Sequence, residues 1–83
     1  MEHTVALIHQ SFHSWFEHQI RKSGMSQKQL ALEIDVSENT VSAWCNGKKT
    51  ITLANFYSAC RVFSKKQNVE LESILIDPEY LID

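Results

Sequence analysis

Apolar residues recur every three or four positions in several stretches of the chain, which is the spacing of one face of an α-helix. The first stretch predicts a helix over residues 4–23, with Thr4 as its N-cap and Gly24 as the residue that ends it. Its apolar face consists of Val5, Ile8, Phe12, Trp15, Phe16 and Ile20. We expect Trp15 and Phe16 to be core or interface residues rather than a stacking platform. Its opposite, polar face carries His9, His13, Glu17 and Arg21.

A second, much shorter helix follows. Ser26 and Gln29 have the spacing of a capping box, in which each side chain bonds a backbone N–H near the other residue. The inward positions of this helix are Leu30, Ala31 and Ile34. The helical pattern breaks at Asp35, so we expect the helix to end there.

The third helix is equally short. Ser37 offers an N-cap, and the pattern predicts a helix from about Glu38 to Cys45 that buries Val41 and Trp44. The dipeptide Asn46-Gly47 is a typical helix stop. Lys48, Lys49 and Thr50 then form an exposed polar loop.

Two more helices complete the pattern. Thr52 caps a fourth helix, whose inward positions are Leu53, Phe56, Cys60 and Phe63. Asn68 caps a fifth helix that contains Leu71, Ile74 and Leu75, and Asp77-Pro78 ends it. No strand-like alternation competes with this interpretation. We therefore predict an all-α fold of five helices that forms one domain over residues 1–83.

The second and third helices have the properties of a helix-turn-helix. Two short helices joined by three or four residues pack at a steep angle, and Ala31 is small enough to let them approach closely. Polar residues occupy the outward positions of the third helix: Glu38, Asn39, Thr40 and Ser42. A helix held in this way projects its N-terminal half outward, where it can enter a major groove.

Residues 26–63 resemble the Cro and lambdoid-repressor (XRE) family of five-helix, lambda-repressor-like DNA-binding domains. The segment SQKQLALEIDVSENTVSAWCNGKK carries the resemblance, with Gln at the start of the first motif helix, Ala in its middle and Asn-Gly after the second. The turn position that is usually Gly in the family is Asp35 here. Asp tolerates a left-handed backbone better than most residues, so the turn can still form.

The resemblance implies a role for individual residues of the motif at 27–46 and of the loop after it. Residues at positions where the family reads base edges are Glu38, Asn39, Ser42 and Ala43. Residues implied to contact phosphates are Gln27, Lys28, Ser37, Thr40, Asn46, Lys48, Lys49 and Thr50. Asn39 could pair with adenine, Glu38 could accept from the cytosine amino group, and Ala43 could touch a thymine methyl.

The distribution of charge separates the middle of the chain from its C-terminal part. The net charge is −2, which alone argues against binding to nucleic acid. However, residues 26–66 contain six basic and three acidic residues, whereas residues 67–83 contain five acidic residues and no basic one. We expect two surfaces with different partners.

The acidic segment 67–83 is also rich in apolar residues, more than a five-helix core needs. We predict a homodimer interface formed by Leu71, Ile74, Leu75, Tyr80, Leu81 and Ile82. Such a dimer would place two recognition helices one turn of DNA apart on a palindromic site. The alternative is that these residues only close the core of one chain.

Other classes of site have weaker support. His9, His13 and Glu17 recur every four residues and could approach a zinc ion, but a polar outer face explains them more simply, so we expect no metal and no cofactor. No nucleophile, base and orienting group can be assembled, so we expect no enzyme. Cys45 and Cys60 form no CxxC pair and are expected to be reduced thiols.

Neither a signal peptide nor an apolar run long enough to span a membrane is apparent, so we expect a cytoplasmic protein without membrane contact, encoded by a bacterium or a phage and associated with the nucleoid. The predicted function is sequence-specific binding of double-stranded DNA, as a transcriptional repressor that binds a palindromic operator as a homodimer. The alternative is a protein-interaction module on the same fold, an antirepressor or antitoxin-like partner.

Overall fold

The computed structural model describes the backbone of residues 2–76 and the side chains of residues 12–76. Five α-helices lie in this part of the chain: α1 (Glu2–Lys22), α2 (Gln27–Ile34), α3 (Glu38–Cys45), α4 (Leu53–Gln67) and α5 (Leu71–Leu75). The described residues contain no strand, and the predicted all-α fold of five helices is confirmed. No helix within residues 2–76 is long and apolar enough to cross a bilayer.

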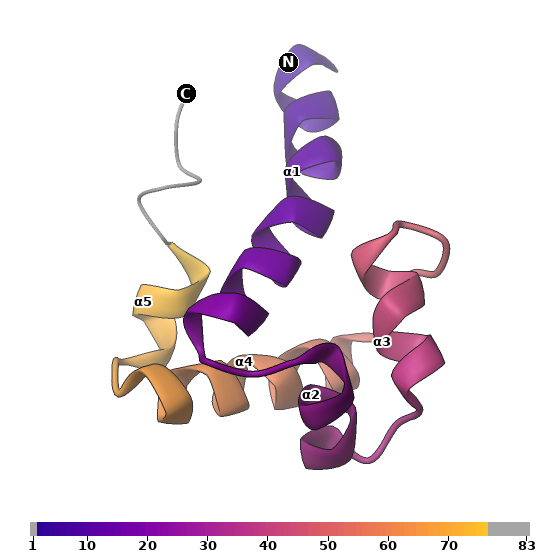
Figure 1. Cartoon of the computed structure of the whole chain (residues 1–83). Coiled ribbons are helices and arrows are strands. Elements are labelled where there is room, and N and C mark those ends of the chain that lie inside the picture. Colours follow the sequence, from indigo (N-terminus) through magenta and orange to yellow (C-terminus); the bar gives the residue numbers. More distant parts are fainter. Residues whose placement is uncertain (1, 77–83) are drawn as a thin grey trace.

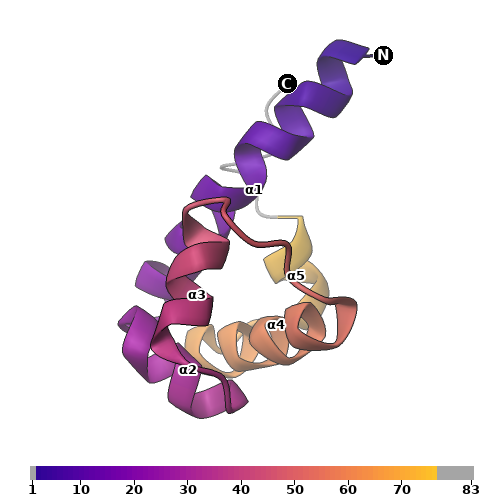
Figure 2. The same ribbon diagram turned by 90° about the vertical axis from the view of Figure 1, so that its right-hand side faces the viewer.

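The helices are arranged around α4 (Figure 1). α1, α3 and α5 rise on the same side of α4, and α2 lies beside α4 next to one end of α3. α2 packs against both α3 and α4, while α5 packs against α4. The N-terminal half of α1 extends beyond the other helices in both views (Figures 1 and 2). The folded body is therefore formed by the C-terminal half of α1 together with the four later helices.

An aromatic cluster occupies the centre of this body. Phe16 is fully buried, and its ring packs edge-on against Trp44 of α3 and Phe63 of α4, with centroids 6.0 and 5.6 Å away. Edge-to-face pairs of this kind are favourable beyond the area that they bury. One ring of α1 thus joins the two helices that carry and support the predicted recognition surface.

A buried polar contact fixes the end of α1 on the end of α4. The side-chain amide of Gln67 donates to Gln19 Oε1 at 2.8 Å and to Ser23 Oγ at 3.0 Å. Gln19 is fully buried, so these hydrogen bonds compensate for taking its amide out of water. They also hold the turn from which α2 begins.

Most of the predicted helix ends are confirmed. Ser26, Ser37 and Thr52 are the N-caps of α2, α3 and α4, and each side chain accepts a backbone N–H three residues later. Gly24 follows α1 with φ +74°. α1, however, begins at Glu2, two residues before its predicted N-cap.

The predicted cap of the fifth helix is wrong. Asn68 ends α4 in the left-handed conformation, φ 58° and ψ 48°, and Glu70 is the N-cap of α5. Asn is one of the few residues that adopt this conformation readily. Asn68 is therefore a helix cap, but at the end of α4 and not at the start of α5.

Two predictions of side-chain direction are also wrong. Leu53 was expected to face inward, but its side chain is 82% exposed at the start of α4. Ile74 was expected in a dimer interface, but it is 1% exposed and belongs to the core of the single chain. Ile74 is the one buried residue of the five-residue helix α5, so its side chain is not available to a partner.

Candidate nucleic-acid interface

The start of α2 is built by the predicted capping box. The backbone N–H of Gln29 donates to Ser26 Oγ at 3.1 Å, and the backbone N–H of Ser26 donates to Gln29 Oε1 at 2.8 Å. The first turn of α2 contains no acidic residue, and Lys28 is exposed there. Backbone N–H groups at a helix start attract anions, so this end of α2 suits a phosphate.

The turn between α2 and α3 depends on a left-handed residue. Asp35 adopts φ 59° and ψ 51°, as its place in the turn required. The N–H of Val36 then donates to the carbonyl oxygen of Ala31 at 3.0 Å, which closes the end of α2. Val36 is partly buried against the core, so the turn is attached to the core before α3 begins.

α3 is fixed by its inner face. Val41 is fully buried and Trp44 is 2% exposed, so both anchor the helix in the core. On its outer face, Glu38 and Asn39 are exposed, and Ser42 and Ala43 are partly buried. Figure 2 shows α3 on the near side of the molecule. The four residues predicted to read bases thus lie together on one helix whose opposite face is anchored.

The hydroxyl groups of Ser37 and Thr40, at the start of α3, contact each other. Ser37 Oγ accepts the backbone N–H of Thr40 at 3.1 Å, and Ser37 Oγ and Thr40 Oγ1 are 2.8 Å apart. Only one of the two hydroxyl protons is needed for that contact. The other proton is available to donate to an external oxygen, such as that of a phosphate.

The loop of Lys48, Lys49 and Thr50, called the basic loop below, is fixed to the end of α3 by hydrogen bonds of the loop backbone. The N–H groups of Lys48 and Lys49 both donate to the carbonyl oxygen of Ala43, at 2.9 and 3.3 Å. The side-chain amide of Asn46 donates to Ser42 Oγ at 3.4 Å. The side chains of Lys48, Lys49 and Thr50 are exposed. The backbone that carries two exposed lysine side chains is therefore fixed to the end of α3.

A contact that the sequence did not predict connects α1 to this loop. His13 was assigned to a polar outer face, but it is partly buried and its ring lies against Gly47. Gly47 has φ +73°, and a Cβ there would lie only 2.7 Å from His13 Nε2. A glycine at position 47 is compatible with close packing of another group against the backbone, but the sequence alone does not identify that group as His13.

The two cysteine thiols are structural. Burial, and in second place the Glu17 carboxylate, raises the pKa of Cys45 to about 11. Burial raises the pKa of Cys60 to about 11 as well. Both are free cysteines, and Cys60 lies in the core as predicted. A raised pKa disfavours the thiolate, which is the form that reacts in redox and catalytic cysteines.

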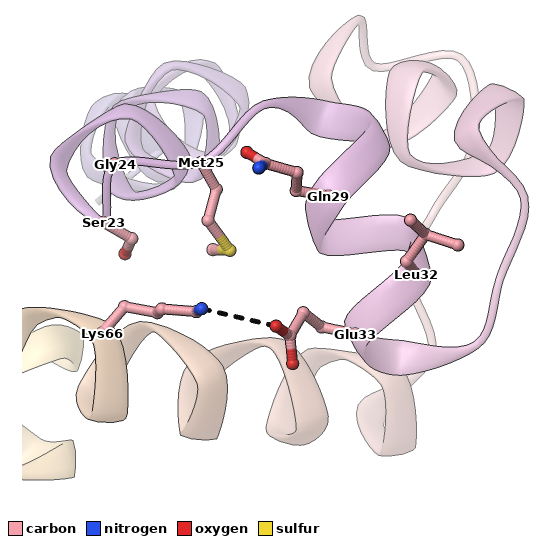
Figure 3. A pocket seen from close by; sticks show the side chains of 7 residues that line it. All are labelled: Ser23, Gly24, Met25, Gln29, Leu32, Glu33 and Lys66. Atoms are coloured by element: carbon pink, nitrogen blue, oxygen red, sulfur yellow. Dashed lines mark ion pairs between the residues drawn. The ribbon is translucent and has the colours of Figure 1, made fainter.

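A shallow pocket of about 390 Å³ lies away from the reading face, between the outer side of α2 and the end of α4 (Figure 3). Lys66 Nζ and Glu33 Oε2 approach to 3.4 Å across it. None of the residues predicted to contact DNA lines this pocket. Among the described side chains, no three of His, Cys, Asp or Glu are placed to share a metal ion.

Comparison with known proteins gives one match. The family model described as "Helix-turn-helix", of the XRE type, matches residues 18–66, which is more than half of the chain. The match begins within α1, contains α2, α3 and the basic loop, and ends one residue before the end of α4. No curated protein and no solved structure matches the chain.

Proposed function

Because the chain belongs to the XRE-type helix-turn-helix family of DNA-binding transcriptional regulators, we propose that it is a repressor that binds a palindromic operator as a homodimer. The observation that carries this proposal is the pairing of a polar outer face on α3 with the exposed Lys48–Lys49 loop fixed to the same helix. A protein of this kind acts in the cytoplasm, on the nucleoid of a bacterium or on phage DNA.

The outer face of α3 reads base edges in the major groove in this proposal. Asn39 is the strongest candidate, since an exposed amide pairs with adenine through two hydrogen bonds. Glu38 accepts a hydrogen bond from a cytosine amino group, and Ala43 offers its methyl group to thymine. Ser42 is partly engaged with Asn46 and contributes a hydroxyl.

Phosphate contacts flank this reading face on both sides. At the start of α2, Gln27 and Lys28 approach one phosphate, supported by the free backbone N–H groups of the helix end. Ser37 and Thr40 offer the hydroxyl proton that their mutual contact leaves available. Further contacts come from the end of α3 and its loop: Asn46, Lys48, Lys49 and Thr50.

The homodimer is proposed to form through the C-terminal part of the chain. Leu71 is partly buried, but Leu75 is 48% exposed and lies at the end of α5. The other proposed interface residues, Tyr80, Leu81 and Ile82, lie outside the described residues. A two-fold axis through this segment would repeat the recognition helix on a palindromic site and would keep the acidic residues away from phosphates.

Selection of bound fragments from a random DNA pool tests the proposed operator. We expect a palindrome to be enriched, with an affinity that falls steeply with salt because phosphate contacts release counterions. An enriched site without two-fold symmetry would contradict the homodimer. An affinity for the selected site that does not change with salt would contradict the phosphate contacts.

The roles of individual residues are tested by comparing two substitutions. Asn39→Ala should cost about 1–3 kcal/mol at the preferred site and relax base preference at one position. Lys48→Ala combined with Lys49→Ala should weaken all sequences alike and lower the salt slope by about 2. Both affinities are measured by titration of labelled duplexes. The reverse pattern would show that the two roles are assigned wrongly.

A protein-binding function on the same fold has support from the net charge of −2 and from the exposed Ile76 beside Leu75. An antirepressor or antitoxin-like partner would use this apolar end rather than α3. Affinity purification with and without nuclease distinguishes the two functions. A partner that stays bound after nuclease treatment, together with no enriched DNA site, would favour protein binding.

A further inference from the structure

The outer face of α4 carries a stripe that the core does not use. Leu53, Tyr57, Arg61 and Lys65 are spaced four residues apart, so each is a surface neighbour of the next, and the series winds obliquely along about 18 Å of the helix. All four are exposed, Leu53 by 82% and Tyr57 by 54%. The core residues of α4 are Ala59, Cys60 and Phe63, and the stripe runs from the edge of their face at Leu53 to the opposite side of the helix at Lys65. We call these four outer residues the α4 stripe.

The chemistry of the α4 stripe is specific. Its first half is apolar and aromatic, and its second half carries two positive charges and no acidic residue. The guanidinium carbon of Arg61 lies 5.9 Å from the centre of the Tyr57 ring, which joins the two halves. A leucine exposed this far is not expected in a surface that only binds phosphate. A peptide with apolar and acidic residues complements the stripe better.

One segment of the chain has the complementary composition. Residues 77–83 place Tyr80, Leu81 and Ile82 between acidic residues, Asp77 and Glu79 on one side and Asp83 on the other. The segment directly follows Leu75 and Ile76, which are exposed by 48% and 57%. Two copies of the α4 stripe would repel each other, because each carries two positive charges.

The geometry points to residues 77–83 of a second copy as the partner of the α4 stripe. α5 packs on the core side of α4, through Ile74 and Leu71 (Figure 1). Half the circumference of a helix of about 10–12 Å diameter is about 16–19 Å, and the stripe adds about 18 Å. Seven extended residues span at most about 25 Å, so the segment of the same chain can reach the charged half of the stripe but cannot go round α4 and also run along the full length of the stripe to Leu53.

In a two-fold dimer the contact occurs twice, because each chain places its segment on the α4 stripe of the other. This inference rests on the homodimer proposed above and identifies the surface that receives its C-terminal segment. The contact combines burial of Leu53 and Tyr57 with charge pairing at Arg61 and Lys65. Dimerisation should therefore be sensitive to the sign of the charges on both sides.

Charge reversal tests the inference in the full chain. The stripe variant carries Arg61→Glu and Lys65→Glu, and the segment variant carries Glu79→Lys and Asp83→Lys. Sedimentation equilibrium should show that each variant alone has a dimer Kd raised at least ~10-fold, since like charges then face each other. An equal mixture of the two variants should form a heterodimer with a Kd within about 3-fold of the unmodified chain, because both contacts are complementary again.

One further variant serves as a control, and another tests the apolar half of the stripe. Arg21→Glu with Lys22→Glu changes the net charge as much as the stripe variant does, at exposed positions at the end of α1, and should leave the dimer Kd unchanged. Leu53→Ser with Tyr57→Ser removes the apolar half of the stripe without altering charge, and should also raise the Kd at least ~10-fold. The six changed positions within the described residues, Arg21, Lys22, Leu53, Tyr57, Arg61 and Lys65, are exposed, so the far-ultraviolet circular dichroism of these three variants should stay unchanged.

Several results would overturn the inference. If the stripe variant and the segment variant each dimerise like the unmodified chain, the α4 stripe does not bind the segment. The proposed homodimer would then form through another surface. A mixture that stays monomeric would show that the two sides do not meet. A stripe variant with weaker DNA binding but an unchanged dimer Kd would make the stripe a DNA contact. An unmodified chain that remains monomeric with and without operator DNA would instead refute the proposed homodimer itself.

Discussion

The segment from α2 to the basic loop and the segment around α5 differ in how their helices are held. α2 and α3 each begin with a serine whose side chain accepts a backbone N–H, and α3 is anchored by two buried side chains. α5 has five residues, no side-chain hydrogen bond at its N-cap Glu70, and one buried residue. The segment from α2 to the basic loop is thus held by capped helix starts and buried side chains, whereas the segment around α5 leaves Leu75 and Ile76 exposed.

The largest expected difference between the two segments concerns the free energy of unfolding. Trp44→Ala removes a side chain that is 2% exposed and should cost about 3–5 kcal/mol, from the lost burial and the cavity left behind. A chain of this size has a stability of roughly 4–12 kcal/mol, so this single change should bring it close to unfolding. Urea denaturation followed by circular dichroism measures the effect.

Leu75→Ala is the matched change in the C-terminal segment. Leu75 is 48% exposed, so its truncation should change stability by about 0.5 kcal/mol or less and act on dimerisation instead. Equal losses of stability in the two variants, measured at a concentration where the chain is monomeric, would remove the distinction between the segments.

The next effect tests whether the end of α3 is also held by α1. Gly47→Ala forces a left-handed backbone, at about 1–2 kcal/mol, and adds a Cβ that overlaps the His13 ring. We expect a total loss of about 2–3 kcal/mol in urea denaturation.

Gly24→Ala provides the control for this change. Gly24 has nearly the same φ, +74°, but no atom lies within 4 Å of its Cβ position, so only the backbone cost of about 1–2 kcal/mol should appear. His13→Ala should reduce the cost of Gly47→Ala towards that value. If the two glycine variants lose the same stability, the His13 contact does not restrain the loop.

The sequence predicted the elements whose signals are local. Ser26, Ser37 and Thr52 were identified as N-caps because a cap requires only a residue type and a helical pattern three residues on. Asp35 was expected in the turn because few residues tolerate a left-handed backbone. The outward residues of α3 followed from the same reasoning, since two buried positions fix the orientation of a short helix.

Features that depend on distant packing were missed. Periodicity places Leu53 on the same face as Phe56 and Cys60, but at the first turn of α4 its side chain remains exposed. The same periodicity could not show that Ile74 completes the core or that His13 meets Gly47. Each of these depends on where another helix lies, which the local pattern does not contain.

A smaller effect compares the N-caps of the two segments. Ser37→Ala removes the acceptor for the Thr40 N–H and should cost about 1 kcal/mol. Glu70→Ala in the C-terminal segment removes no cap hydrogen bond and should change stability by less than about 0.5 kcal/mol. Thermal unfolding of both variants measures the difference. A larger loss from Glu70→Ala would mean that α5 is held more firmly at its start than α3.

The smallest expected effect concerns Asp35, where this chain departs from the family's usual glycine. Asp35→Gly relieves the left-handed conformation and should raise the free energy of unfolding by about 0.5 kcal/mol. Asn68→Gly relieves the same left-handed conformation at the end of α4, φ 58°, without changing charge.

Only Asp35→Gly also removes a carboxylate beside the proposed phosphate contacts. It should therefore increase affinity for the selected DNA about 2-fold at low salt, and the gain should vanish near 1 M salt, where charges are screened within about 3 Å. Weaker DNA binding by Asp35→Gly would mean that the carboxylate contributes to recognition, and the turn would then belong to the reading surface rather than only shaping it.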